Sequence, residues 1–393
     1  MRRYLILSSA FLMQMCLGAT YSWTVFVRPI RELTGLSQGI AQIPFTMFYF
    51  AFPVTLLFSG SILRNLGPRR SAVLGTILFC SGWSVAGLGG ASAFAFVVGG
   101  VGLLAGVGVG CAYIVPIAVG NRWFPEQPGL VTGIAVAGFA VGAALVGLGA
   151  EAMMLGGGMS PFQTLALLGV VFLLLGVPAA AVMEFPDGVA PPASVSPGRS
   201  ALLRSVEFRQ LLPAMVAGLA AGFAVNSNLK DLDPAGHIIS GASAVSVFAV
   251  ANAAGRIAWG YLFDQMLPSS VIRLNLFSQA AVLAAAFLIV TDLPGLLVFA
   301  GLAGFNYGGM LVLYASTAAR RWGVQHVGQV YGLLFTANIV ASPAPILAGF
   351  SLDLFGSFVP AFLGFSALAA AAALRVGGPV DRLPGEGDPA AGP

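Results

Sequence analysis

Arg256 is the residue whose type and position most clearly predict chemistry. It lies in the apolar segment Val247-Phe-Ala-Val-Ala-Asn-Ala-Ala-Gly-Arg256-Ile-Ala-Trp-Gly260, eight residues before Asp264. That spacing places it about 12 Å from the helix end, where a guanidinium needs a partner or a wet cavity. Its planar fork can bind a carboxylate through two hydrogen bonds. We therefore interpret Arg256 as a clamp for an anion, with an internal salt bridge or a side chain reaching the membrane interface as the alternatives.

Other polar side chains at comparable depth could orient the rest of such an anion. Asn252 lies one helical turn before Arg256 on the same face. Tyr307 and Tyr113 each place a hydroxyl beside glycine-rich backbone. For both tyrosines, aromatic packing with a hydroxyl bonded to a backbone carbonyl is the alternative. The predicted substrate-binding set is Arg256, Tyr307, Tyr113, Asn252, Asn306 and Tyr21.

Charged turns are the candidate gates. The loop 60–70 reads Gly-Ser-Ile-Leu-Arg-Asn-Leu-Gly-Pro-Arg-Arg. We predict that Arg64 and Arg69 of this loop contribute to gating, together with Asp264. The segment 349–356, Gly-Phe-Ser-Leu-Asp-Leu-Phe-Gly, has a similar shape on the opposite side. Tight turns with interfacial charges explain these segments equally well.

The elements that must position these residues are membrane-spanning helices. The chain is 58% hydrophobic and 8% charged, whereas soluble domains carry about 25% charged residues, so most of the surface must face lipid. A bilayer core takes about 20 apolar residues per helix. Cutting at charges and turn residues predicts an all-α polytopic membrane protein with twelve spans: 5–27, 40–62, 71–90, 93–117, 129–153, 162–183, 211–228, 239–262, 272–290, 293–317, 328–350 and 356–375.

Two similar halves make up the predicted chain. A proline-containing cytoplasmic linker, 184–210, separates a six-helix bundle at 1–183 from a second at 211–375, and a disordered cytoplasmic tail follows at 376–393. Matching residues recur at nearly constant offsets: Arg122-Trp123 and Arg321-Trp322 are 199 positions apart, Gly60 and Gly260 are 200 apart, and Tyr113 and Tyr314 are 201 apart. These offsets indicate a parallel six-plus-six repeat.

The distribution of cations predicts the orientation. With the N-terminus inside, fourteen arginines are cytoplasmic, and the outer cations are Arg28, Arg31 and Lys230. This positive-inside bias predicts a multi-pass protein of the cell inner membrane with both termini in the cytoplasm.

Three motifs resemble the oxalate/formate antiporter and monocarboxylate transporter branch of the major facilitator superfamily. They are Asn121-Arg-Trp-Phe-Pro125 followed by Gly129-Leu-Val-Thr-Gly133, the opening Tyr21-Ser-Trp23-Thr-Val-Phe26, and Asn252-Ala-Ala-Gly255-Arg256. The resemblance covers essentially the whole chain. It implies the major facilitator fold with the substrate between the halves, Arg256 on the substrate carboxylate, and Tyr113 and Tyr307 in the pocket.

Departures from that resemblance bear on the substrate. The oxalate transporter carries a Lys in helix eleven, and span 328–350 has none. The family's loop signature has an Asp where Arg64 stands. Animal monocarboxylate transporters have an Asp where this chain has Asn252, and a Lys near Tyr21. One intramembrane cation neutralises one carboxylate, so a monocarboxylate is favoured over oxalate.

We therefore expect a secondary active transporter of small organic anions, most readily monocarboxylates such as lactate, pyruvate or formate. It would work by alternating access, with either proton symport or anion exchange. The expected partners are the anion, protons and the lipid bilayer, without nucleic acid, cofactor or metal, and the protein is expected to be a monomer. An enzyme is not expected, because the sequence shows no P-loop and no nucleophile–base pair, and His237 and His326 fall in loops. The alternatives are a major facilitator exporter of drugs or other small metabolites and a transporter-like membrane receptor.

Overall fold

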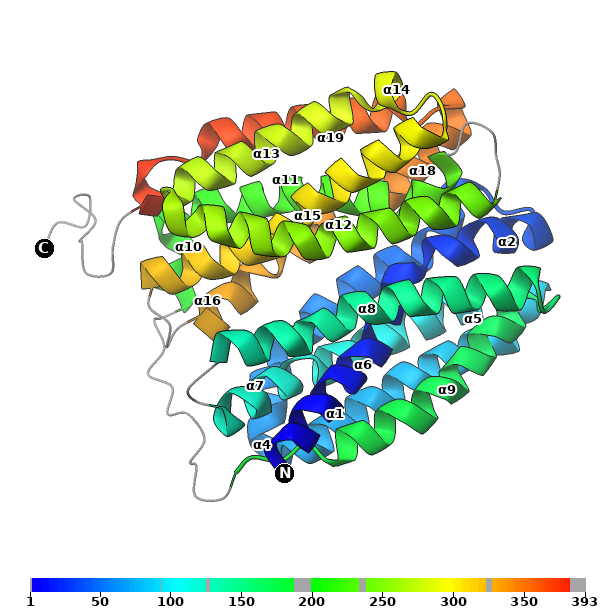
Figure 1. Ribbon diagram of the computed structural model, residues 1–393, viewed down its shortest axis with the longest axis horizontal. Coiled ribbons are helices and arrows are strands. Elements are labelled where there is room, and N and C mark those ends of the chain that lie inside the picture. The colour runs from blue at the N-terminus through cyan, green and yellow to red at the C-terminus, as the bar shows by residue number, and fades with distance from the viewer. Residues whose placement is uncertain are drawn as a thin grey trace, which may run out of the picture.

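The chain folds into two groups of helices that lie side by side. The computed structural model describes residues 2–92, 94–124, 128–186, 199–232, 238–322 and 327–381, and the regular structure in these ranges is helical. Figure 1 shows the first half of the chain in blue to green and the second half in green to red. The expected all-α architecture is confirmed, and the twelve predicted spans all fall on helical segments.

The first half is built from long helices interrupted at a few places. Its elements are α1 (Arg2–Leu17), η1 (Gly18–Ser22), α2 (Thr24–Thr34), α3 (Gln38–Ala41), α4 (Ile43–Leu88), η2 (Gly90–Ser92), α5 (Ala95–Val97), η3 (Val98–Leu104), α6 (Ala105–Ala112), α7 (Ile114–Trp123), α8 (Pro128–Leu155) and α9 (Pro161–Ala181). Two predicted spans lie within α4, which bends at Gly67 with φ 76° and ψ 168°. Only glycine adopts this backbone region readily. The predicted loop 60–70 is therefore a sharp break within helical structure.

The second half repeats this plan. Its elements are α10 (Arg199–Arg204), α11 (Val206–Asn228), η4 (Leu229–Leu232), α12 (Ile238–Gln265), α13 (Pro268–Ala284), α14 (Ala286–Ile289), α15 (Leu293–Trp322), α16 (Val327–Leu334), α17 (Ala337–Ala341), α18 (Ala344–Phe355), α19 (Val359–Arg375) and η6 (Gly378–Asp381). The first long helix of the second half, α11, begins at Val206, five residues before the predicted boundary at 211.

Length and apolar composition agree with a membrane location. Eight helical segments of the described residues are long and apolar enough to cross a bilayer, and one of them, Gln38–Leu88, contains two predicted spans. The shorter apolar helix α19 accompanies them. The predicted span 239–262 falls on α12, which is 28 residues long.

We call the two ends of the bundle inner and outer, following the orientation predicted from the cations. The inner end carries the start of α1 and the end of α19, and the outer end carries the α2–α3 turn (Figure 1). Parts of the predicted linker and tail are ordered at the inner end. Asp381 of η6 accepts hydrogen bonds from the backbone nitrogen and the hydroxyl of Ser269, at 2.8 and 2.6 Å. Residues 187–198 and 382–393, with His237 and His326, lie outside the described residues.

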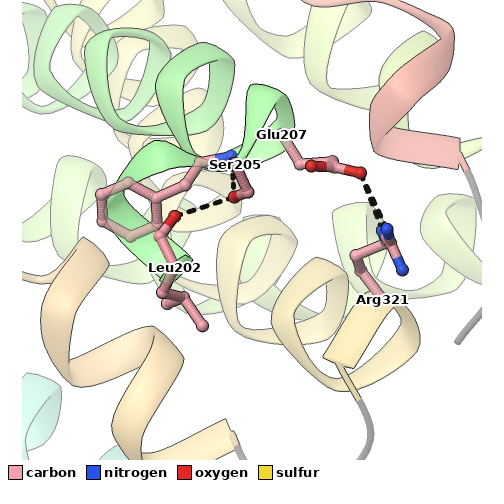
Figure 2. Close-up of polar contacts among 5 residues, drawn as sticks. Leu202, Ser205, Glu207 and Arg321 are labelled. Atoms are coloured by element: carbon pink, nitrogen blue, oxygen red, sulfur yellow. Dashed lines mark hydrogen bonds and ion pairs between the residues drawn. The ribbon is translucent and has the colours of Figure 1, made fainter. Parts of the chain in front are cut away.

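An ion pair joins two helices of the second half at the inner end. Figure 2 shows Glu207 of α11 facing Arg321 of α15, with Glu207 Oε1 2.8 Å from Arg321 Nη2. Both side chains are largely buried, at 6% and 15% exposure. Ser205 caps the start of α11 by accepting from the backbone nitrogen of Phe208. Burial of these two opposite charges together is less costly than burial of either one alone.

Candidate functional site

A narrow cavity lies between the two halves and contains Arg256. Its volume is about 30 Å³, room for about two water molecules. The second half contributes the face of α12 that carries Arg256, and the first half contributes mainly α8. The lining residues are Tyr21, Phe139, Ala140, Ala143, Ala144, Asn226, Val245, Phe248, Ala249, Asn252 and Arg256.

Arg256 is half-buried, and its guanidinium is only partly engaged. Its Nε donates to Asn252 Oδ1 at 3.1 Å. Within the described ranges, the ion pairs involve other cations and none reaches Arg256. The bond to Asn252 orients the fork and leaves its two terminal nitrogens for another acceptor. A bidentate carboxylate is the acceptor that this geometry fits.

Close backbone packing between α12 and α15 fixes the position of Arg256 along the helix bundle. A Cβ built on Gly308 of α15 would collide with the backbone oxygen of Asn252 and lie 3.1 Å from the backbone nitrogen of Arg256. Gly304 meets the backbone of Phe248 in the same way, and Gly255 meets that of Phe305. Small residues let α12 and α15 approach this closely. The rigid contact therefore positions the turn that carries Arg256.

Tyr21 connects the two halves beside the cavity. It lies in η1, where span one changes from α-helix to a tighter helix. Its hydroxyl is 3.1 Å from that of Tyr307 on α15, close enough for a hydrogen bond in which either can donate. Phe139 packs edge-on against the Tyr21 ring, with centroids 5.2 Å apart. The hydroxyl bridge thus spans the interface next to the Arg256 cavity.

Tyr113 and Tyr307 lie near the cavity without lining it. Tyr113 interrupts the helix between α6 and α7, and its carbonyl accepts from the buried side chain of Gln14 at 3.1 Å. Its ring packs against Phe139 with centroids 5.8 Å apart.

Asn306 lies apart from the other predicted binding residues. Its amide donates to the backbone oxygen of Leu302 on its own helix at 3.0 Å, and its backbone oxygen accepts from Asn275 of α13. It is absent from the cavity lining. One residue separates it from Gly308 in sequence, but its side chain bonds to its own helix and does not line the cavity. Sequence position alone could not distinguish these faces.

The predicted gating residues are exposed at the inner end. Arg64 donates to Ser61 on its own helix at 3.1 Å. Arg69 and Asp264 are also exposed, and within the described residues no ion pair joins any of the three. The structure therefore does not bring these three side chains together.

The outer end, in contrast, is closed by hydrogen bonds between the halves. Asp353, at the end of α18, accepts from the backbone nitrogens of Gln38 and Gly39, both at 2.9 Å. The Gln38 side chain donates to Asn228 at 2.9 Å and to Asp231 at 2.8 Å. These contacts tie the start of α3 to α18, α11 and η4. The segment 349–356 was the sequence signal for Asp353, but nothing in the sequence indicated its partners.

A largely buried ion pair adds to this closure. Lys230 Nζ lies 2.9 Å from Glu151 Oε1, with side-chain exposures of 7% and 12%. Glu151 belongs to α8 of the first half and Lys230 to η4 of the second. Opening the outer end must separate these charges as well as the hydrogen bonds.

Asn226 is a cavity residue that sequence reasoning missed. It lies on α11, is 4% exposed, and its amide nitrogen has no partner among the described residues. The available signal was an asparagine in an apolar span, as for Asn252. The three cysteines Cys16, Cys80 and Cys111 are free and buried, and the described residues contain no metal-ligating cluster.

Comparisons with known proteins agree with this architecture. The model of the Major Facilitator Superfamily matches residues 8–344. The oxalate:formate antiporter of Oxalobacter formigenes is 26% identical over 353 residues, which cover 86% of this chain and 82% of that protein. The apicoplast pyruvate carrier 1 of Toxoplasma gondii is 26% identical, covering 72% of this chain and 64% of the carrier.

A solved structure supports the fold independently. A bacterial homologue of the human lysosomal transporter Spinster, solved in an inward-facing and unoccupied conformation, aligns with a TM-score of 0.65. The alignment covers 95% of this chain and 94% of that structure at 14% sequence identity. At this identity the likeness concerns the fold alone.

Proposed function

This chain belongs to the Major Facilitator Superfamily, and we propose that it is a secondary transporter of small organic anions that carry one carboxylate. Transport would proceed by alternating access, in which the two halves expose the cavity to one side of the membrane at a time. The proposal includes an inner-membrane location with both termini in the cytoplasm, as the cation distribution favours. Proton symport and anion exchange both remain consistent with it.

Arg256 is the single observation that carries this proposal. It faces a cavity at the interface of the halves, and no acid of the described residues neutralises it. An arginine at membrane depth is costly unless its charge is balanced. A substrate carboxylate would supply that charge and accept the two terminal nitrogens. The oxalate:formate antiporter and the pyruvate carrier, by their names, handle small carboxylate anions.

The rest of the lining favours a single carboxylate. Arg256 is the one cationic residue among the lining residues, and Phe139, Phe248 and a run of alanines provide apolar walls. A second carboxylate would lose its hydration without gaining a cation, which is unfavourable. The rest of the substrate, beyond its carboxylate, should therefore be short and apolar or weakly polar to pack against this apolar lining.

Movement of the halves is a required step in this mechanism. The cavity of about 30 Å³ is far below the roughly 300 Å³ of a typical small-molecule site. The outer end is also held shut by Asp353 and by the Lys230–Glu151 pair. We propose that binding follows a separation of the halves at the inner end, which breaks the Tyr21–Tyr307 bridge and releases both hydroxyls to the substrate.

Counterflow in proteoliposomes tests the proposal. Purified protein would be reconstituted and assayed with radiolabelled formate, lactate, pyruvate, glyoxylate and oxalate, with and without a pH gradient. We expect counterflow of monocarboxylates, little of oxalate, and no competition by methyl pyruvate, which lacks the carboxylate. Dependence on the pH gradient would separate symport from exchange. Transport of neutral or cationic compounds with no response to any carboxylate would contradict the proposal and favour an exporter.

A further inference from the structure

We propose that Asn226 forms a second binding position for the substrate carboxylate, on the outer side of Arg256 in the same cavity. The proposal rests on the proposed function, because it assumes an anion that travels through this cavity. It assigns to Asn226 a role as a hydrogen-bond donor on the path between Arg256 and the outer end.

Burial without a partner is the first observation. The Asn226 side chain lines the cavity and is 4% exposed, yet its amide nitrogen makes no hydrogen bond within the described residues. Nearly all buried polar groups in proteins are paired, so an unpaired buried donor needs an explanation. Other buried asparagines here use their amides: Asn228 donates to Ala224 and Asn338 donates to Phe335, at 2.9 and 2.7 Å. Asn226 is therefore available to a transient acceptor.

The second observation is the length of α12 that lines the cavity. The cavity follows one face of α12 from Val245 to Arg256, which is about 16 Å at about 1.5 Å per residue. Asn226 lies one turn beyond Gly222 on α11, and Gly222 packs on the ring of Tyr307. The Tyr307 ring is in turn 6.0 Å from Phe248. Asn226 thus lies near the outer end of the cavity and Arg256 near the inner end.

A small monocarboxylate cannot reach both ends at once. A three-carbon acid is about 5 Å long, whereas the face of α12 from Val245 to Asn252, where the guanidinium of Arg256 is bonded, is about 10 Å long. The two polar ends must therefore act one after the other. The chemistry also suits this order, because a neutral amide holds a carboxylate less tightly than a guanidinium does. The anion would bind first at Asn226 and then at Arg256, or in the opposite order when it travels outward.

The neighbours of Asn226 connect this position to the outer closure. Ser227 and Asn228 follow it directly, and both accept hydrogen bonds from the Gln42 side chain across the interface, at 2.8 and 3.1 Å. An anion at Asn226 would therefore lie one residue from the contacts that must break before it can leave outward. This places the second position immediately inside the outer gate.

Kinetics and binding, measured together, test the assignment. In proteoliposomes, Asn226→Leu should lower kcat/KM for the fastest monocarboxylate of the panel by about tenfold, the effect of one hydrogen bond to a charged group. Its equilibrium Kd in detergent, set by Arg256, should change by less than about twofold. Asn226→Asp, which keeps the shape and repels the anion, should lower kcat/KM further than Asn226→Leu does.

Asn338→Leu is the matched control. Asn338 is equally buried at 2% exposure, and its amide is used by its own helix. Wild-type kcat/KM in Asn226→Leu would overturn the proposal, as would an equal fall in kcat/KM and affinity, or an equal loss in the control. Failure of the proposed function is distinguishable, since it would appear as unchanged anion binding by Arg256→Ala whatever Asn226 does.

Discussion

The span 40–62 in the first half and α12 in the second half make the same backbone contact but carry different chemistry. Gly106 and Gly110 of α6 pack on the backbone oxygens of Phe48 and Phe52. Gly304 and Gly308 of α15 pack on those of Phe248 and Asn252, which are 200 positions later. The repeat detected in the sequence is therefore a repeat of helix packing.

The next turn shows where the halves differ. An offset of 200 aligns Leu56 with Arg256 and Phe52 with Asn252. Phe52 packs edge-on against Tyr113 and Phe335, with centroids 5.3 and 5.5 Å apart. Asn252 instead orients the guanidinium of Arg256. Two equivalent scaffolds thus hold an aromatic contact in the first half and a charged side chain in the second half.

The Arg-Trp pairs of the two halves show the same asymmetry at the inner end. Arg321 forms the buried ion pair with Glu207 (Figure 2). Arg122, its counterpart 199 positions earlier, lies 3.7 Å from the centre of the Phe185 ring. The arginine of the Arg-Trp dipeptide therefore forms an ion pair in the second half and a cation–π contact in the first half.

The largest difference between the halves in their effect on anion binding is expected at the equivalent positions Arg256 and Leu56. Arg256→Ala should weaken binding of the transported monocarboxylate at least about 100-fold, because a buried carboxylate would lose its counter-charge. Leu56→Ala should change Kd by less than about threefold. Isothermal titration in detergent measures both. Arg256→Lys should also be impaired, since a point charge lacks the fork. If the two alanine variants bound the anion with equal affinity, the proposed difference between the two halves would be wrong.

A smaller difference in anion binding is expected when the same Gly→Ala substitution is made at a helix contact in each half. Gly308→Ala and Gly110→Ala each push a methyl into the backbone of the neighbouring helix, and each should destabilise the fold by about 1–3 kcal/mol. Only Gly308→Ala displaces the turn of Arg256, so it should weaken anion binding by about tenfold or more. Thermal unfolding and titration of the same samples separate stability from binding. Wild-type affinity in Gly308→Ala would mean that α12 adapts without moving Arg256.

The smallest effect on anion binding is expected at the inner end. Glu207→Ala should lower the free energy of unfolding by about 3 kcal/mol, because it removes the carboxylate from a largely buried ion pair. Arg122→Ala should lower it by about 1 kcal/mol, the range of a cation–π contact. Neither variant should alter Kd for the anion. Thermal unfolding of both variants in one detergent measures these losses of stability. Equal shifts in Tm would contradict the predicted difference between the ion pair and the cation–π contact.

The fold and part of the candidate site could be predicted because both depend on local sequence. The apolar segments, the repeat offsets and the depth of Arg256 follow from residues close together in the chain. Arg256, Asn252 and Tyr21 do line one cavity, and Tyr307 is bonded to Tyr21. Their role in binding stays a prediction.

Other features required contacts that the sequence does not encode locally. Asn306 was predicted on the basis of its position beside Tyr307, but its side chain bonds to its own helix outside the cavity lining. The outer closure joins residues 190 and 315 positions apart. Its partners depend on how α3, α11 and α18 meet, which no short motif specifies.

Apolar length and cation placement by themselves determined a polytopic helical chain with two related halves and one deep arginine, because the cost of exposing polar groups to lipid acts on each segment separately. The tertiary structure alone decided which polar groups meet: Asn226 with the cavity, Gln38 with Asn228 and Asp231, and Glu151 with Lys230. Those encounters depend on the rotation and crossing of helices. Packing between distant segments sets both.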